Sequence, residues 1–384
     1  MARRSSETER ARLHDTFATL CAIASPSRDE RACADRVSSE LRSMGLEVSE
    51  DPSAPQIGSD AGNLFARVPG RSPQSILICA HLDTVPPVAP IEPVLVDGYW
   101  CNANEAILGA DNKSAVAVAI ELARRLTSAS EPPRVGLELL FTVCEEISLR
   151  GSREFDVTRL QSAFGYVFDH ATPIGEIVLG SPTHYRIVAE FRGRAAHAGV
   201  RPEAGASAIA GAAAAIAAMR LGRLDAETTA NVGLIEGGTA INVVPERCRV
   251  EAEVRSLDDA RAAAVATETV DHMQDGANAA ECDLDVNVEQ MFRGYRTKPS
   301  ATQVQVAERA LRRCGYEPKA IDSGGASDAN SFHTGGFQCT NLADGTERNH
   351  EPGERISAQA LEDLLEIAIA LVDEAAVELG APGR

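Results

Sequence analysis

The chain has 384 residues, which is more than one ordinary domain and predicts two. Its 37 basic and 56 acidic side chains give a net charge of −19, which argues against nucleic acid or an anionic membrane as a partner. Nine cysteines, with no Cys-x-x-Cys pair, fit reduced thiols in the cytoplasm better than a disulfide framework. No window approaches the ~18 uninterrupted apolar residues of a membrane helix, and the charged N-terminus is not a signal peptide.

The first part of the chain alternates predicted strands and helices. Apolar runs and turn residues predict strands at 46–49, 63–68, 75–81, 135–143 and 165–168. Helical spacing predicts helices at 6–24, 29–45 (capped by Asp29) and 115–126. This order indicates an α/β domain built on a mixed sheet.

The pattern changes after residue 181 and changes back after 293. Strands at 185–191, 230–236, 247–255 and 283–288, with helices at about 203–221 and 258–280, follow the βαββαβ order of a ferredoxin-like α+β domain. Beyond it we expect a helix at 301–314, a strand at 319–321, a glycine-rich loop at 323–332, an apolar segment at 337–342 and a helix at 357–378. The predicted organisation is one domain (1–181 and 294–384) interrupted by an inserted domain (182–293).

Acidic and imidazole side chains follow several of the predicted buried strands. His81 ends one apolar run, and Asp83, two residues later, faces the same way. Taken alone, this pair is explained equally well as a core histidine with a capping aspartate. The same type of residue recurs at Asp111, Glu145, Glu146, Asp169 and His350. Buried strands ending in unpaired carboxylates carry a high desolvation cost, which a pair of divalent cations would remove.

These motifs resemble the M20 family of co-catalytic metallopeptidases. The matching pieces occur in the family's order over almost the whole chain: His81-Leu-Asp83-Thr-Val-Pro, Gly109-Ala-Asp111-Asn-Lys, Glu145-Glu146, Asp169, Ala196-His197-Ala-Gly, Ile241-Asn242-Val-Val-Pro, Gly324-Gly325-Ala-Ser-Asp328 and His350-Glu-Pro-Gly-Glu354. Within the family, the segment from Gly324 to Asn330 is most similar to the tripeptidase T-like branch. The resemblance implies a zinc-peptidase catalytic domain with an inserted dimerisation and lid domain.

The resemblance also implies a role for each metal-site residue. His81 and Asp169 would hold one zinc ion, Glu146 and His350 the other, and Asp111 would bridge them. Cobalt and manganese accept the same ligands. In the family the peptide bond after the bridging aspartate, here Asp111–Asn112, is often cis.

Two further residues of this domain have implied roles. Glu145 would be the general base; the alternative, a solvated acidic pair, is disfavoured because Glu145-Glu146 ends a buried strand. Asp83 would orient His81, as ligating histidines usually require.

The resemblance assigns substrate contacts mainly to the inserted domain. In related dimers the residue equivalent to His197 reaches the partner's active site and polarises the scissile carbonyl. Asn242 and Arg255 resemble substrate-binding positions, Gly325 would bring backbone donors close to the substrate, and Asp328 would meet a substrate amine. Each has a plainer explanation, such as a surface histidine, an exposed strand-end arginine or an ordinary turn.

The expected function is hydrolysis of small peptides by a cytoplasmic homodimer, as an aminopeptidase of the tripeptidase type. An N-acyl amino acid deacylase or a carboxypeptidase on the same scaffold is the alternative. Asn330 argues mildly against the deacylases, which usually have arginine there. A catalytically silent binding protein would need a broken ligand set, whereas every expected ligand type is present.

Overall fold

The computed structural model describes residues 4–380 and separates the chain into two compact units. The first unit contains the described residues up to 179, together with 297–323 and those from 327 onward; the second contains 180–296 and 324–326. The chain passes from one unit to the other at 179/180 and 296/297, within three residues of the predicted boundaries 181/182 and 293/294. At these points the two passing segments pair antiparallel, Gly180 with Arg296 and Ser181 with Tyr295.

A nine-stranded mixed sheet forms the centre of the first unit, in the order β1-β2-β6-β3-β7-β16-β8-β14, with β15 beside β8. Its strands are β1 (Val48–Glu50), β2 (Leu64–Val68), β3 (Ser75–His81), β6 (Gly136–Thr142), β7 (Ser162–His170), β8 (Glu176–Ser181), β14 (Tyr295–Arg296), β15 (Lys319–Asp322) and β16 (Cys339–Ala343). The four strands β6, β3, β7 and β16 run parallel, so their carboxyl ends lie at one edge. Every residue of β3 and β6 is buried, as their continuous apolar sequences require for the middle of a covered sheet.

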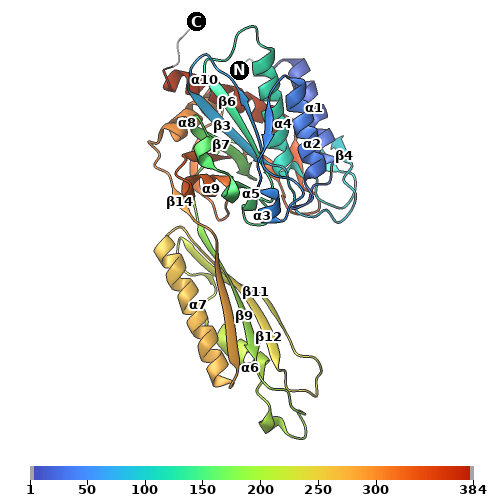
Figure 1. Cartoon of the computed structure of the whole chain (residues 1–384), viewed down its shortest axis with the longest axis vertical. Coiled ribbons are helices and arrows are strands. Elements are labelled where there is room, and N and C mark those ends of the chain that lie inside the picture. The colour runs from blue at the N-terminus through green and yellow to red at the C-terminus, as the bar shows by residue number, and fades with distance from the viewer. Residues whose placement is uncertain (1–3, 381–384) are drawn as a thin grey trace. The chain divides into compact units, whose positions relative to one another are not determined.

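Helices cover this sheet. They are α1 (Glu7–Cys21), α2 (Arg31–Ser43), α3 (Ala54–Ile57), α4 (Ala110–Ser128), α5 (Arg150–Glu154), α8 (Thr302–Arg313), α9 (Asp328–Thr334) and α10 (Ala358–Glu378), with a 3₁₀ turn at Val157–Arg159. The buried helix α4 packs on β3 and β7, and both α1 and α10 pack against α4 (Figure 1). A small sheet, β17-β18-β5-β4, is built from β4 (Pro93–Val96), β5 (Tyr99–Asn102), β17 (Thr346–Glu347) and β18 (Arg355–Ser357).

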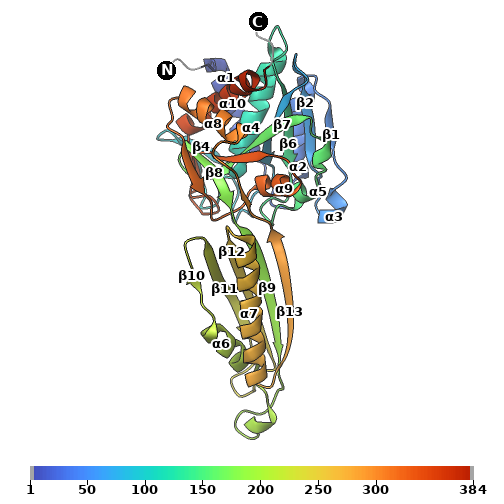
Figure 2. The same ribbon diagram turned by 90° about the vertical axis from the view of Figure 1, so that its left-hand side faces the viewer.

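The second unit has the predicted βαββαβ order. Its elements are β9 (Thr183–Arg192), α6 (Ala208–Ala218), β11 (Thr228–Gly237), β12 (Arg247–Ser256), α7 (Asp259–Ala279) and β13 (Asp283–Phe292), with a short β10 (Gly222–Arg223) and a 3₁₀ turn at Pro202–Ala204. The antiparallel sheet runs β10-β11-β12-β9-β13, and α6 and α7 pack against it and each other (Figure 2). This unit has its own apolar core, which includes Phe191, Val254 and Met273.

Three local predictions are wrong. The helix expected at 203–221 is shorter, because residues 202–204 form a 3₁₀ turn and α6 begins only after the cap Ser207. The expected glycine-rich loop stops early, because Asn330 Oδ1 accepts the Ser327 N–H and α9 starts at Asp328. Asp29 does not cap α2, whose N-cap is Glu30.

Candidate metal centre

The parallel strands bring the predicted ligands to one edge of the sheet. His81 is the last residue of β3 and lies opposite Thr142, the last residue of β6. Glu145 and Glu146 follow β6 directly, and Asp169 lies at the end of the neighbouring β7. Ligands beyond the carboxyl ends of adjacent parallel strands converge because those ends share an edge.

Asp111 lies between two histidines. Its Oδ1 is 3.1 Å from His81 Nε2, and its Oδ2 is 3.4 Å from His350 Nε2. His81 Nε2 is also 3.8 Å from Asp169, and His350 Nε2 is 3.0 Å from Glu146. One oxygen of Asp111 therefore faces each imidazole, as a bridging carboxylate requires. The peptide bond after Asp111 is cis, in agreement with the expectation.

The side chains are close enough to share cations. Within residues 4–380, ligand atoms of His81, Asp111 and Glu146 lie within 4.8 Å of one another, as do those of His81, Glu145 and Asp169. Two imidazoles and several carboxylates form a donor set that suits two zinc ions or similar divalent cations. The five predicted ligands thus meet at one place, and the residues present fit a dinuclear centre.

The electrostatics of the cluster agree with this fit. Burial, reinforced by nearby carboxylates, raises the pKa of Glu145 and of Asp169 well above the ordinary range. Hydrogen bonds with Asp111 and Glu146 raise the pKa of His350 to about 10. So many buried acids next to one another are unfavourable unless positive charge compensates them, and divalent cations would supply that charge.

Asp83 holds the centre together in two ways. His81 Nδ1 lies 2.9 Å from the backbone carbonyl of Asp83; because a carbonyl only accepts, Nδ1 carries the proton and Nε2 is free to bind a metal. The Asp83 carboxylate accepts the backbone N–H groups of Glu145 (3.0 Å) and Glu146 (3.1 Å). Ser27 Oγ donates to the same carboxylate at 2.6 Å. Asp83 therefore orients the glutamate pair as well as His81.

Two asparagines support the ligands and were missed in the sequence. The side chain of Asn341 on β16 accepts the Asp169 N–H at 3.0 Å and donates to the Asp169 carbonyl at 2.8 Å. Asn349 Nδ2 donates to Asp111 Oδ2 at 3.1 Å. Asn349 could have been predicted, because it directly precedes the proposed ligand His350. Asn341 could not, because only the pairing of β16 with β7 brings it to Asp169.

The predicted substrate contacts fall mostly on the second unit. His197 and Asn242 are exposed on two paired loops, in which the Ala198 N–H donates to the Asn242 carbonyl at 3.0 Å. Arg255 on β12 donates to Glu253 and to the Gly324 carbonyl. Gly325 accepts a hydrogen bond from Ser181 Oγ.

Asp328, predicted to meet a substrate amine, is enclosed by its neighbours. It is 1% exposed at the start of α9, and its carboxylate accepts a hydrogen bond from Thr142 Oγ1 at 2.5 Å beside Cys79 Sγ. His81 is equally buried and still lies in the centre, so the contact of Asp328 with a substrate amine stays a prediction. The sequence did not reveal this burial because α9 was expected to be a loop.

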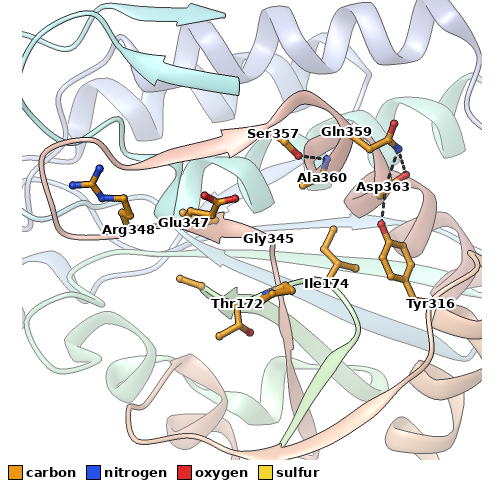
Figure 3. Close-up of a pocket in the computed structure, with 13 residues that line it drawn as sticks. Thr172, Ile174, Tyr316, Gly345, Glu347, Arg348, Ser357, Gln359, Ala360 and Asp363 are labelled. Atoms are coloured by element: carbon orange, nitrogen blue, oxygen red, sulfur yellow. Dashed lines mark hydrogen bonds between the residues drawn. The ribbon is translucent and has the colours of Figure 1, made fainter. Parts of the chain in front are cut away.

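A separate pocket of about 490 Å³ opens in the first unit between the segment after β7 and the start of α10 (Figure 3). Ile174 and Ala360 form apolar walls, and Tyr316 donates a hydrogen bond to Asp363 at 2.7 Å. None of the predicted metal ligands is among the described residues that line it. We therefore do not assign this pocket to the reaction.

Two family models match parts of this chain. A model described as "Peptidase dimerisation domain" matches residues 183–281, and one described as "Peptidase family M28" matches residues 63–171. The protein YqjE of Bacillus subtilis is 33% identical over 95% of this chain and 98% of its own length.

Two solved structures cover both units. The aminopeptidase PepT of Bacillus cereus shares 36% identity, with a TM-score of 0.87 over 96% of this chain and 99% of its own. A tripeptidase of Staphylococcus aureus shares 31% identity, with a TM-score of 0.91 over the same shares. No helix in the described part of the chain meets the length and hydropathy needed to cross a membrane.

Proposed function

Since this chain belongs to the M20 family of metal-dependent peptidases, we propose that it removes the N-terminal residue of small peptides, above all tripeptides, as a dinuclear zinc enzyme. The two solved structures that cover both units are an aminopeptidase and a tripeptidase, which supports peptide hydrolysis. The observation that carries the proposal is the position of Asp111 between His81 and His350, with further carboxylates around both imidazoles.

The proposed ligand sets follow the distances. His81 and Asp169 would hold one ion, Glu146 and His350 the other, and Asp111 both. When bound, the two ions would lower the pKa of water and polarise the scissile carbonyl. The donor set suits zinc, and cobalt or manganese would also be accepted.

Glu145 would move the proton. Its backbone N–H is held by Asp83 and the residue is 9% exposed, so Glu145 lies at the edge of the centre and is largely shielded from bulk water. In this position Glu145 would accept a proton as the nucleophile forms and return it to the leaving amine. Asp83 keeps Glu145 and Glu146 in a fixed relation because one carboxylate accepts both of their N–H groups.

The second unit would supply substrate contacts and the dimer surface. His197 would donate a hydrogen bond to the oxyanion, Arg255 would bind a terminal carboxylate, and Asn242 and Gly325 would contact the peptide backbone. The match of residues 183–281 to a peptidase dimerisation domain supports a homodimer. Nine free cysteines support a reducing compartment such as the cytoplasm.

A carboxypeptidase is the second candidate. A probable carboxypeptidase of Paracoccidioides brasiliensis is 32% identical, but over only 62% of this chain. The products from Leu-Gly-Gly separate the two activities, because an aminopeptidase releases leucine and a carboxypeptidase releases glycine first. Hydrolysis of N-acetyl amino acids instead would indicate a deacylase.

The test of the proposed function combines metal analysis with product analysis. We expect about two divalent ions per chain, loss of Leu-Gly-Gly hydrolysis on chelation, and recovery on adding zinc, cobalt or manganese. Glu145→Gln should lower kcat by about 10²–10⁴-fold while both ions stay bound, because it removes only the proton acceptor. Exposed Glu154 gives the matched control, Glu154→Gln, which should keep full activity. Turnover that resists complete removal of metal would refute the proposal.

A further inference from the structure

A buried glutamate next to the metal centre has no role in the mechanism described above. Glu354 is 1% exposed, and its carboxylate accepts three backbone hydrogen bonds from one short stretch of chain. Oε2 accepts the N–H groups of Leu108 (2.8 Å) and Gly109 (2.7 Å), and Oε1 accepts that of Asp111 (2.8 Å). One side chain therefore fixes the backbone on both sides of the bend that leads to Asp111.

This stretch needs such an anchor. Gly109 has φ +77°, a left-handed conformation that glycine adopts without strain, and it directly precedes α4. Asp111 and Asn112 have non-helical backbone angles, so the buried N–H groups of this stretch need partners outside a regular helix. A carboxylate that accepts three of these N–H groups meets this need and holds Asp111 in a defined position.

The segment that carries Glu354 also contacts the side chain of Asp111. Asn349 donates to Asp111 Oδ2 at 3.1 Å, and His350 Nε2 lies 3.4 Å from the same oxygen. His350 itself is about half exposed, with φ +64°, so packing alone does not restrain it. The segment 349–354 therefore contacts Asp111 twice, through side-chain contacts at one end and through the backbone bonds of Glu354 at the other.

We propose that Glu354 is a positioning residue that holds Asp111 and His350 in register and thereby sets the affinity for the metal ion that they share with Glu146. This inference rests on the proposed dinuclear centre and extends it to a residue that touches neither metal nor substrate. The other ion would share Asp111 but depend less on Glu354, because its remaining ligands, His81 and Asp169, are fixed by β3 and β7 and not by the segment 349–354.

Glu354→Gln tests the inference by titration of both ions against a competing chelator. The amide has one acceptor oxygen, and its NH₂ group faces backbone N–H groups, so at least one of the three bonds is lost. We expect the affinity for one ion to fall about 10–100-fold, the range seen when residues supporting metal ligands are changed, and that for the other to fall less than about threefold. With Leu-Gly-Gly, kcat should fall at low metal, KM should change little, and added metal should restore kcat.

Glu366→Gln is the matched control. Glu366 is also a buried carboxylate that accepts backbone N–H groups, those of Arg4 and Ser5, both at 2.9 Å. Its replacement should lower the melting temperature and leave both metal affinities at the wild-type values. Glu354→Asp keeps the charge but shortens the side chain, and should lower the affinity for the same ion about 3–10-fold in a chain that folds.

Three results would overturn the inference. Wild-type affinities for both ions in folded Glu354→Gln would show that Glu354 only stabilises the fold. Should that variant fail to fold, unchanged affinities in Glu354→Asp would lead to the same conclusion. If the wild-type chain binds no pair of ions, the proposed function fails and this inference fails with it, a result distinct from the first two because it appears in the wild type.

Discussion

Asp83 supports three residues of the metal centre by hydrogen bonds and is not itself one of the proposed ligands. Asp83 binds the N–H groups of Glu145 and Glu146 through its side chain and the His81 ring through its carbonyl. The two bonds to the carboxylate are stronger than bonds between neutral groups, because their acceptor is charged. The proton acceptor and two ligands thus share one support, so an error in placing Asp83 would displace all three.

His333 gives a prediction about pH. It is largely buried in α9, and its Nε2 donates to the Cys339 carbonyl at 2.7 Å; burial lowers its pKa below 6.5. Below pH 6.5 the unfolded chain therefore binds a proton at this site before the folded chain does, and stability falls as pH decreases from 6.5 toward the folded pKa. At higher pH both states are neutral at His333, and its contribution is constant.

We expect His333→Gln to weaken this pH dependence. Chemical denaturation at matched metal content should give a free energy of unfolding that falls less steeply below pH 6.5 than in the wild type. The difference in slope is limited to about 1.4 kcal/mol per pH unit for one proton. Parallel curves for the two proteins between pH 5 and 7 would contradict the assignment.

Long apolar runs in the sequence predicted the central strands, whereas some short strands of mixed composition were not predicted. The fully buried β3 and β6 stand out in the sequence, and so His81 and the pair Glu145-Glu146, at and near their ends, were found. By contrast, β8 and the hairpin β4–β5 have mixed composition and are defined by their partners, which the sequence does not display. The burial of Asp328 was not predicted for the same reason, because it depends on the packing of α9.

Close packing at the pocket of Figure 3 gives a prediction for Gly345. This glycine has φ +77°, and a Cβ built on it would lie 2.9 Å from Ala360 Cβ of α10 and 3.2 Å from Ile174. Gly345→Ala should therefore combine the cost of a left-handed alanine, about 1–2 kcal/mol, with overpacking of about 1–3 kcal/mol.

Gly336 is the matched control for this substitution. It has φ +84°, with nothing within 4 Å of a built Cβ, so Gly336→Ala should lose only the backbone contribution. Thermal or urea unfolding should place Gly345→Ala below Gly336→Ala by about 1–3 kcal/mol. Equal losses in the two variants would mean that α10 moves freely at this contact.

For the whole molecule, the second unit is an insertion with adjacent ends. The Thr297 N–H donates to the Leu179 carbonyl at 2.7 Å, and Ser181 pairs with Tyr295 in an antiparallel ladder. Two strands paired antiparallel in this way can be joined directly by a two-residue turn. Because each unit has its own apolar core, neither needs the other to bury its apolar side chains.

We therefore predict that replacing residues 182–294 by Asn-Gly leaves a folded first unit. All five predicted ligands and Glu145 remain, so two metal ions should bind with nearly the affinity of the full chain. His197, Asn242 and Arg255 are removed, and Leu-Gly-Gly hydrolysis should fall by at least about 100-fold, the loss seen when one oxyanion donor is removed. Sedimentation should show a monomer, because the segment that matches a dimerisation domain is gone. If the shortened chain bound metal and kept full activity, catalysis would require only the first unit, and the substrate roles proposed for the second unit would have to be abandoned.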